Sequence, residues 1–378
     1  MASPRVEGDR DATGDDAGPF RRGHAEEAEF TTSGHTGDPV AWRRTHAQLR
    51  AEATLVADAA VGPAGSLDHI VNFAPIHHLY GHLFGEVLPR LWDVEVHQAW
   101  RDEVTAVPPL RGAARTLLVC LPSSWPLLRR LVPALRRLPS VVALHSSAAP
   151  TEAAGEVVRA LDGTGFRAVS LLGSTETGAV AHRPVAPTGV EPGPWRLLPD
   201  VTLLPDPCPD AGGEGAHRLR VASPRLGRRA DMAAPPASWR LADVVRPLGP
   251  REFDYLGRTS RLVKANGRRV WLDQVEAAVR AALPGVEAVC LPVSDPVRGE
   301  HYEVCLAAGS VPAGTGAREV RAAIGAALPG APGPRAVHTV PELPRTTTGK
   351  IRIPALRDLL DHVRREADAA AGEALARA

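Results

Sequence analysis

Lysine is nearly absent from this sequence, and the two lysines that it keeps lie where a charged amine could act chemically. Of the 44 Lys and Arg side chains, only Lys264 and Lys350 are lysines. Arginine can replace lysine on most solvated surfaces, but not where a compact ammonium is needed. Survival by chance is the alternative interpretation. Chance is disfavoured because both lysines lie in segments with glycines and several polar side chains, 257–270 and 344–352.

Two further segments combine glycines with hydroxyl side chains in a way that suits phosphate. Residues 31–39 read Thr-Thr-Ser-Gly-His-Thr-Gly-Asp-Pro, and residues 173–178 read Gly-Ser-Thr-Glu-Thr-Gly. Glycines let backbone N–H groups approach an anion, hydroxyls add donors, and Glu176 could hold a magnesium ion. A polar turn and a helix N-cap are the plainer interpretations of the two segments. Neither contains the Gly-Lys-Ser/Thr of a P-loop, so a P-loop NTPase is disfavoured.

Taken in order, the four segments resemble the adenylate-forming superfamily, which includes acyl- and aryl-CoA synthetases, nonribosomal peptide adenylation domains and luciferases. The resemblance runs from about Phe30 to Leu360. Two segments are individually specific: Gly-Ser-Thr-Glu-Thr-Gly, and the Pro-Arg-Thr-x-x-Gly-Lys that ends at Lys350. The joint occurrence of the four leaves little room for coincidence.

The resemblance implies a two-step reaction. ATP and Mg²⁺ would activate a small carboxylic acid as acyl-AMP, with loss of pyrophosphate. The acyl group would then pass to the thiol of coenzyme A or of the phosphopantetheine on an acyl carrier protein. Between the steps the family rotates its small domain, here about Ser260. That rotation would withdraw Lys350 and bring the Lys264–Arg269 loop to the site.

The resemblance also implies roles for single residues. Lys350 would bridge acid and nucleotide, Thr175 would hold the α-phosphate, and Glu176 would bind magnesium. His78 lies in a segment similar to the family's Pro-x-x-His-x-x-Gly and would border the acid pocket. The residues implied for binding nucleotide and cosubstrate are Thr32, Ser33, Gly34, Thr36, Gly37, Ser147, Ala148, Gly173, Ser174, Thr175, Asp243, Arg258, Lys264 and Gly267.

Three departures from the family pattern bear on activity. Val40 replaces the usual lysine after the loop proline, so Arg43 or Arg44 would have to supply that charge, and Leu172 replaces a tyrosine that stacks on adenine. Only about 30 residues precede the phosphate loop, so the large domain is expected to be incomplete at its N-terminus. Compact relatives associated with aryl-acid and fatty-acid activation are the subfamily that fits. Two alternatives stay open: a member that binds without turnover, and a half-enzyme that needs a partner chain.

Hydrophobic spacing predicts the elements that must position these segments. Strands alternating with helices predict an α/β large domain that becomes β-rich after Pro184, followed by a small α+β domain. We expect a disordered tail over 1–28, the AMP-binding domain over 29–259 and the mobile small domain over 260–378. The predicted strands are Glu29–Thr32, Leu117–Leu121, Val141–Leu144, Trp195–Leu198, Arg218–Val221, Ala288–Val293, Glu303–Ala308 and Ala336–Val340. The predicted helices are His46–Ala60, Trp125–Arg137, Gln274–Leu283, Ala317–Leu328 and most of Ile353–Arg377.

Composition narrows the partners. The formal net charge of +1 gives no reason to expect nucleic acid or an anionic membrane. The four cysteines form no CxxC pair, so neither a zinc site nor a disulfide framework is predicted. Apolar runs are short and the N-terminus lacks a signal-peptide core, so we expect a cytoplasmic protein.

Overall fold

The computed structural model describes residues 27–32, 40–103, 106–112, 114–209, 215–265, 268–295, 299–312, 315–346, 349–363 and 365. The predicted phosphate-loop residues Ser33, Gly34, Thr36 and Gly37 lie outside the described residues, as does Gly267. Within the described ranges, no helix is long and apolar enough to cross a membrane.

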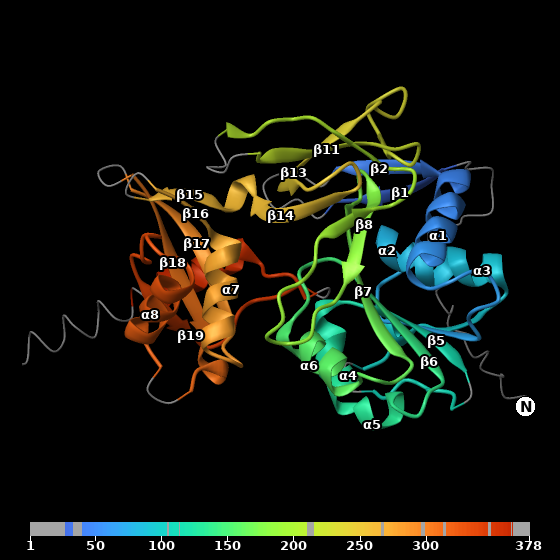
Figure 1. The fold of residues 1–378 in the computed structure, drawn as a ribbon, viewed down its shortest axis with the longest axis horizontal. Helices are drawn as coiled ribbons and strands as arrows, with labels where there is room; N and C mark the ends of the chain where they lie inside the picture. The colour runs from blue at the N-terminus through green and yellow to red at the C-terminus, as the bar shows by residue number, and fades with distance from the viewer. Residues whose placement is uncertain are drawn as a thin grey trace, which may run out of the picture.

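A sheet of eleven strands forms the centre of the large domain, in the order β10-β11-β13-β14-β9-β8-β7-β6-β5-β3-β4 (Figure 1). The strands from β7 to β4 run parallel, and the strands from β7 to β10 pair antiparallel. The parallel strands are β3 (His69–Asn72), β4 (Glu95–His97), β5 (Arg115–Cys120), β6 (Ser140–His145) and β7 (Phe166–Ser174). The antiparallel part adds β8 (Gly178–Pro184), β9 (Trp195–Leu197), β10 (Thr202–Leu204), β11 (His217–Ala222), β13 (Trp239–Pro247) and β14 (Glu252–Arg258). The predicted change to β-rich structure after Pro184 is confirmed.

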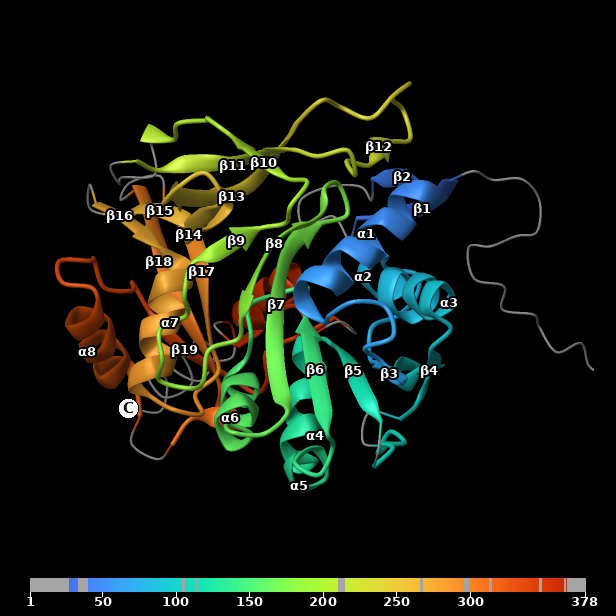
Figure 2. The ribbon, with the colours of Figure 1, turned by 45° about the vertical axis from the view of Figure 1, so that its right-hand side comes forward.

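The parallel strands are apolar along their length because helices cover both faces of the sheet. In β5, Leu117 and Val119 pack into one core, whereas Leu118 and Cys120 pack into another. Figure 2 shows the helices on the two sides of β5, β6 and β7. The first core is covered by α1 (His46–Ala60) and by a continuous helix of α2 (Leu79–His82), the π-turn η1 (Leu83–Val87) and α3 (Leu88–Trp92). The second is covered by α4 (Trp125–Arg130), α5 (Val132–Leu135) and α6 (Glu152–Ala160).

Local sequence explains where these helices begin and end. Thr45 and Gln48 form a capping box at the start of α1, and the predicted helix is confirmed to its ends. The Thr151 hydroxyl accepts from the backbone N–H of Ala154 at the start of α6. The helix predicted over Trp125–Arg137 is wrong in one respect, because it breaks at Leu131, where a new turn begins with a proline in its first positions.

A small sheet at the edge of the large domain combines β1 (Glu27–Thr31), β2 (Ala41–Thr45) and β12 (Arg228–Arg229). The strand β1 begins at Glu27, so the last two residues of the predicted tail are in a strand. Residues 1–26 lie outside the described residues.

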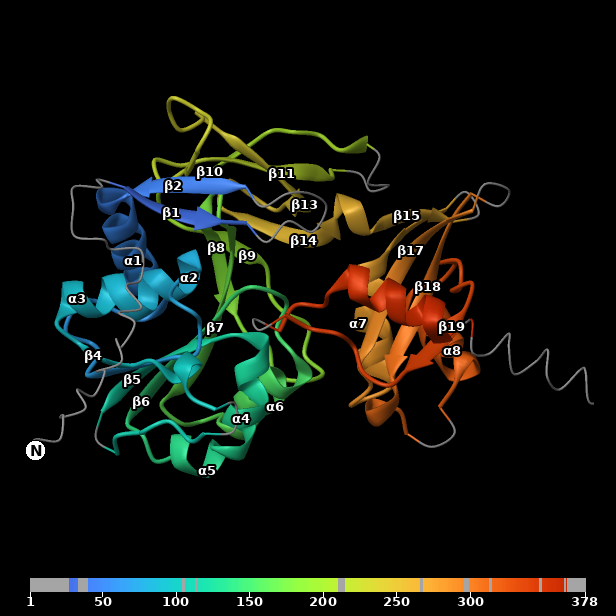
Figure 3. The ribbon, with the colours of Figure 1, turned by 180° about the vertical axis from the view of Figure 1, so that it is seen from behind.

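The small C-terminal domain follows β14. Its elements are β15 (Leu262–Ala265), β16 (Arg268–Trp271), α7 (Leu272–Ala282), β17 (Ala288–Asp295), β18 (Gly299–Ala307), α8 (Ala317–Ala327), β19 (Val337–Val340) and helical residues 353–363. Short 3-10 turns are η2 (Ala99–Arg101), η3 (Pro122–Ser124), η5 (Thr259–Arg261) and η6 (Ala308–Ser310). From behind, two segments drawn in red extend from the small domain to the large domain near α4 and α6 (Figure 3).

Candidate nucleotide and acid site

The Gly-Ser-Thr-Glu-Thr-Gly segment forms the turn between β7 and β8, so its interpretation as a helix N-cap is wrong. The Ser174 and Thr177 hydroxyls lie 3.1 Å apart and close the turn. A Cβ atom at Gly173 would lie 2.1 Å from the Gly178 carbonyl oxygen, so only glycine fits there. The turn leaves the side chains of Thr175 and Glu176 half-buried at the end of the parallel strands. Among the described residues, no hydrogen bond occupies the Glu176 carboxylate, which fits a carboxylate kept for a cation.

Asp243 and Arg258 are cross-strand neighbours on β13 and β14. The Arg258 Nε–H donates to Asp243 Oδ1 at 3.0 Å, and the Tyr255 hydroxyl donates to the same oxygen at 3.1 Å. Asp243 is buried, whereas the side chain of Arg258 is 46% exposed. Two donors therefore fix the carboxylate through one oxygen, and within the described ranges no hydrogen bond occupies the second oxygen, which could accept from a ligand hydroxyl.

The Lys350 loop packs directly against the large domain. The Thr346 backbone N–H donates to the Lys350 carbonyl at 2.8 Å, which closes a tight turn. Gly349, with φ +84°, sits so close to η3 that a Cβ atom would lie 3.1 Å from Pro122 Cβ. Burial lowers the pKa of Lys350, the charge of Arg258 lowers it further, and the Glu176 carboxylate raises it. These charges from two domains therefore face one another.

His78 completes this group from the start of α2. Burial lowers its pKa to about 4, and the charges of His77 and Lys350 act in the same direction. The imidazole is therefore neutral at pH 7. Its ring lies 4.4 Å from that of His77, which in turn meets Trp100 edge-on at 6.2 Å.

The loop after β6 contains the predicted residues Ser147 and Ala148, and Ser147 has a left-handed φ of +84°. His145 supports this loop. The Trp125 indole N–H donates to His145 Nδ1 at 2.9 Å. Because an indole is only a donor, the imidazole proton must be on Nε2, and it is donated to the Ala148 carbonyl at 2.9 Å. Complete burial lowers the pKa of His145 to about 4. His145 and Trp125 were not predicted as site residues, because one lies in an apolar strand and the other in a helix.

Thr32 and Lys264 are the other predicted residues that the structure describes. The Thr32 hydroxyl donates to the Val40 carbonyl at 3.3 Å. Lys264 lies on the β15–β16 hairpin with an exposed side chain, and its backbone N–H donates to Glu300 at 2.8 Å. The structure thus gathers Lys350, Glu176 and Arg258, whereas Lys264 lies on the outer hairpin of the small domain (Figure 1).

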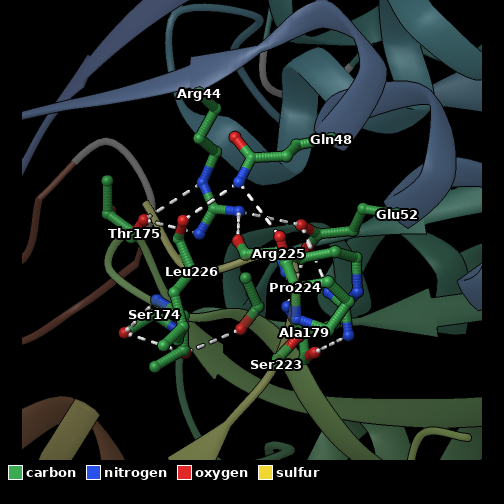
Figure 4. A network of polar contacts seen from close by, with 12 residues as sticks. Arg44, Gln48, Glu52, Ser174, Thr175, Ala179, Ser223, Pro224, Arg225 and Leu226 are labelled. Carbon is green, nitrogen blue, oxygen red and sulfur yellow. Dashed lines mark hydrogen bonds and ion pairs between the residues drawn. The ribbon is translucent and has the colours of Figure 1, made fainter. Parts of the chain in front are cut away.

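The suggestion that Arg43 or Arg44 replaces the missing loop lysine is wrong for Arg44. Its side chain is 0% exposed and pairs with Glu52 at 3.2 Å, away from solvent. Its Nη2 and Nε donate to the Thr175 carbonyl at 2.9 and 3.3 Å (Figure 4). Arg43 lies on the exposed face of β2 and pairs with Glu29 at 3.0 Å. The sequence signal for the buried Arg44–Glu52 pair was the position of Glu52 on the apolar face of the predicted helix His46–Ala60.

An α/β domain with a glycine- and hydroxyl-rich hairpin at its strand ends, joined to a small C-terminal domain, is the architecture of the adenylate-forming proteins. ATP-bound MatB from Rhodopseudomonas palustris has this fold, with a TM-score of 0.69 and 20% identity over 88% of this chain and 67% of its own. The chain is 31% identical over 340 residues to a 4-coumarate–CoA ligase of Rhodobacter capsulatus. The aligned region covers 88% of this chain and 76% of the relative. A 4-coumarate–CoA ligase of Halorhodospira halophila matches at 29% over 48% of this chain and 41% of its own length. No protein-family model matches. The chain belongs to the adenylate-forming superfamily of acyl- and aryl-CoA ligases.

Proposed function

We propose that this chain uses ATP to activate a carboxylic acid as acyl-AMP, with release of pyrophosphate, and then transfers the acyl group to a thiol. The thiol belongs to coenzyme A or to a carrier-protein pantetheine. The observation that carries the proposal is the packing of the Lys350 loop, through Gly349, against Pro122 and Ser123 of the large domain. At this position the pKa of Lys350 is lowered by burial and by the charge of Arg258 and raised by the Glu176 carboxylate.

The chemistry explains why this grouping matters. A carboxylate must attack the α-phosphate of ATP, so two anions have to meet, and positive charge and donors at the phosphate lower the barrier. We assign the neutralising charge to Lys350 and the α-phosphate contact to Thr175. Glu176 is the ligand for Mg²⁺, which would neutralise phosphate charge when bound, and Asp243 with Arg258 holds the ribose.

The acid lies beside His78 in this proposal. A neutral imidazole, with its pKa lowered to about 4, can border an apolar acid without burying a second charge. Aryl and fatty acids are the substrate classes that we favour. In the second step the small domain turns about Ser260, and the Lys264 hairpin replaces Lys350 at the site.

The test is an acid screen with ATP and Mg²⁺, read for pyrophosphate release and, by mass spectrometry, for acyl-AMP. Adding coenzyme A or a phosphopantetheinylated carrier protein then separates the two thiols. We expect acyl-AMP from at least one aryl or fatty acid and a thioester with one of the two thiols. ATP binding without pyrophosphate release from any acid would favour a non-catalytic homologue, and activity that appears only with a second chain would favour a split enzyme.

A further inference from the structure

A cluster of three buried charged side chains, Arg44, Glu52 and Arg225, lies directly behind the β7–β8 turn (Figure 4). The half-buried Asp200 pairs with Arg225 and completes the cluster. Two guanidinium groups face two carboxylates, so the cluster is formally neutral. Glu52 Oε2 pairs with Arg44 Nη1 at 3.2 Å and with Arg225 Nη1 at 3.3 Å. Arg225 also forms a two-bonded ion pair with Asp200, to which its Nε donates at 2.7 Å and its Nη2 at 2.9 Å.

We call these four residues the Arg44 cluster. Three of them form hydrogen bonds with the backbone of the turn or of Ala179, which follows it. Arg44 donates twice to the Thr175 carbonyl. Glu52 Oε1 accepts from the Ala179 N–H at 2.7 Å, and Arg225 Nη2 donates to the Ala179 carbonyl at 2.9 Å. The turn is therefore held on both sides of Glu176. The fit is close, since a Cβ atom at Gly178 would lie 2.3 Å from Glu52 Oε2.

A second layer of contacts holds the cluster itself. The Gln48 side-chain amide donates to the Pro224 and Leu226 carbonyls at 3.1 Å each, which joins α1 to the 223–227 loop. The Gly227 N–H from that loop donates to the Glu176 carbonyl at 2.8 Å. Both residues of the turn that we assign to phosphate and Mg²⁺ thus have their carbonyl oxygens occupied from behind.

We propose that Arg44 and its cluster are positioning residues for ATP activation, which hold Thr175 and Glu176 where the α-phosphate and its cation bind. The inference rests on the proposed function. A buried ion pair is weak evidence for stability, because desolvation offsets the attraction. The cluster is instead used to fix one backbone turn in place, and a misplacement of about 1 Å can cost about a hundredfold in rate.

The test measures two partial reactions in the same variants: acyl-AMP formation from ATP, and thioester formation from supplied acyl-adenylate. Arg44→Lys keeps the charge but loses the planar fork that reaches Thr175 and Glu52 together. We expect acyl-AMP formation to fall at least about tenfold, with a higher Mg²⁺ requirement, while thioester formation from supplied acyl-adenylate falls much less, because that step does not depend on a cation at Glu176. The matched control is Arg196→Lys, at an exposed arginine that pairs with Glu252 on the antiparallel part of the sheet, which should leave both rates unchanged.

Two more variants separate positioning from stability. Leu135→Ala creates a cavity under α5, in the core that the cluster does not touch, so it reports what lost stability alone does to the two rates. Arg44→Met with Glu52→Gln removes one charge of each sign, which keeps the cluster neutral if Arg44→Lys fails to fold. Equal losses in both partial reactions that follow the melting temperature, or no loss in either, would overturn the inference. A wild-type protein that makes no acyl-AMP would instead refute the proposed function.

Discussion

Lys350 of the small domain lies near enough to Glu176 of the large domain that this carboxylate raises the pKa of Lys350, against the larger lowering by burial and by Arg258. Lys350 reaches this position because its loop packs Gly349 against Pro122 and Ser123. A second contact, from the Gly285 N–H to Glu152 Oε2 at 2.8 Å, also joins the domains. The structure therefore has the Lys350 loop at this position, whereas Lys264 points to solvent from the β15–β16 hairpin. We interpret this as the arrangement for acid activation.

Glu176→Gln tests the magnesium assignment. A neutral amide is a poorer ligand for a hard cation, so the variant should need a severalfold higher Mg²⁺ concentration to reach half of its maximal rate. A Mg²⁺ titration of pyrophosphate release measures this. Glu252→Gln, which alters an exposed pair with Arg196, is the control. An unchanged Mg²⁺ dependence in the Glu176 variant would mean that the carboxylate has another role.

Gly178→Ala tests the fit between the turn and the Arg44 cluster. Gly178 has φ +69°, and an added Cβ atom would meet the Glu52 carboxylate. Positive φ alone costs an alanine about 1–2 kcal/mol, and the clash adds to it. We expect the free energy of unfolding to fall by at least about 2 kcal/mol in urea. Gly112→Ala, at an open position without positive φ, should change it by less than about 1 kcal/mol. Equal effects would show that the turn can relax.

His145 is expected to make the stability of the folded protein sensitive to acid. Its pKa in the folded protein is lowered to about 4, whereas the unfolded chain titrates near its ordinary 6.5. The unfolded state therefore binds the proton first, and stability present above pH 6.5 is lost as the pH falls toward 4. One such group loses about 2 kcal/mol between pH 7 and pH 5.

The measurement compares urea unfolding at pH 7 and pH 5 for wild type and His145→Gln. The glutamine variant has no proton to gain, so its loss between the two pH values should be smaller by about 2 kcal/mol, whatever its stability at pH 7. Other groups titrate alike in both proteins and cancel in the difference. Identical pH dependence would contradict a neutral, buried His145.

Ser260→Pro tests the hinge. On one side of Ser260, the Thr259 hydroxyl donates to the Ala242 carbonyl of the large domain at 3.2 Å. On the other side, Arg261 pairs with Asp273 and Glu276 of the small domain. Exposed Ser260 lies between these anchors, and proline would fix its φ and remove its N–H. We expect one partial reaction to survive and the other to drop far more. Ser260→Ala should change neither, and a parallel loss of both in the proline variant would contradict the hinge.

The sequence predicted the features that depend on residues close to one another along the chain. The helix His46–Ala60 was predicted to its ends because its cap and its apolar spacing are contiguous. Apolar runs likewise predicted β5 and β6, since buried parallel strands carry them on both faces. Proline and glycine placement also indicated the β-rich part after Pro184.

The Arg44 cluster could not be predicted, because its members come from three segments that are separated in the sequence and meet only through the fold. Replacing a lysine by a nearby arginine was a reasonable expectation from charge alone. It is wrong for Arg44 because successive residues of a strand face opposite sides, so that Arg43 is exposed and Arg44 is buried. The tautomer of His145 was equally hidden, as it depends on Trp125 from another element.

The measurement that tests the central claim most directly is the rate of acyl-AMP formation by Lys350→Ala. The loop backbone is held by Thr346 and Gly349, so the fold and its melting temperature should survive the change. Removing one charge contact to the transition state costs roughly 3 kcal/mol or more, so pyrophosphate release should fall on the order of a hundredfold. Thioester formation from supplied acyl-adenylate should persist, because that step does not use Lys350 in our account. Pyrophosphate release at the wild-type rate from a folded Lys350→Ala protein would contradict the account.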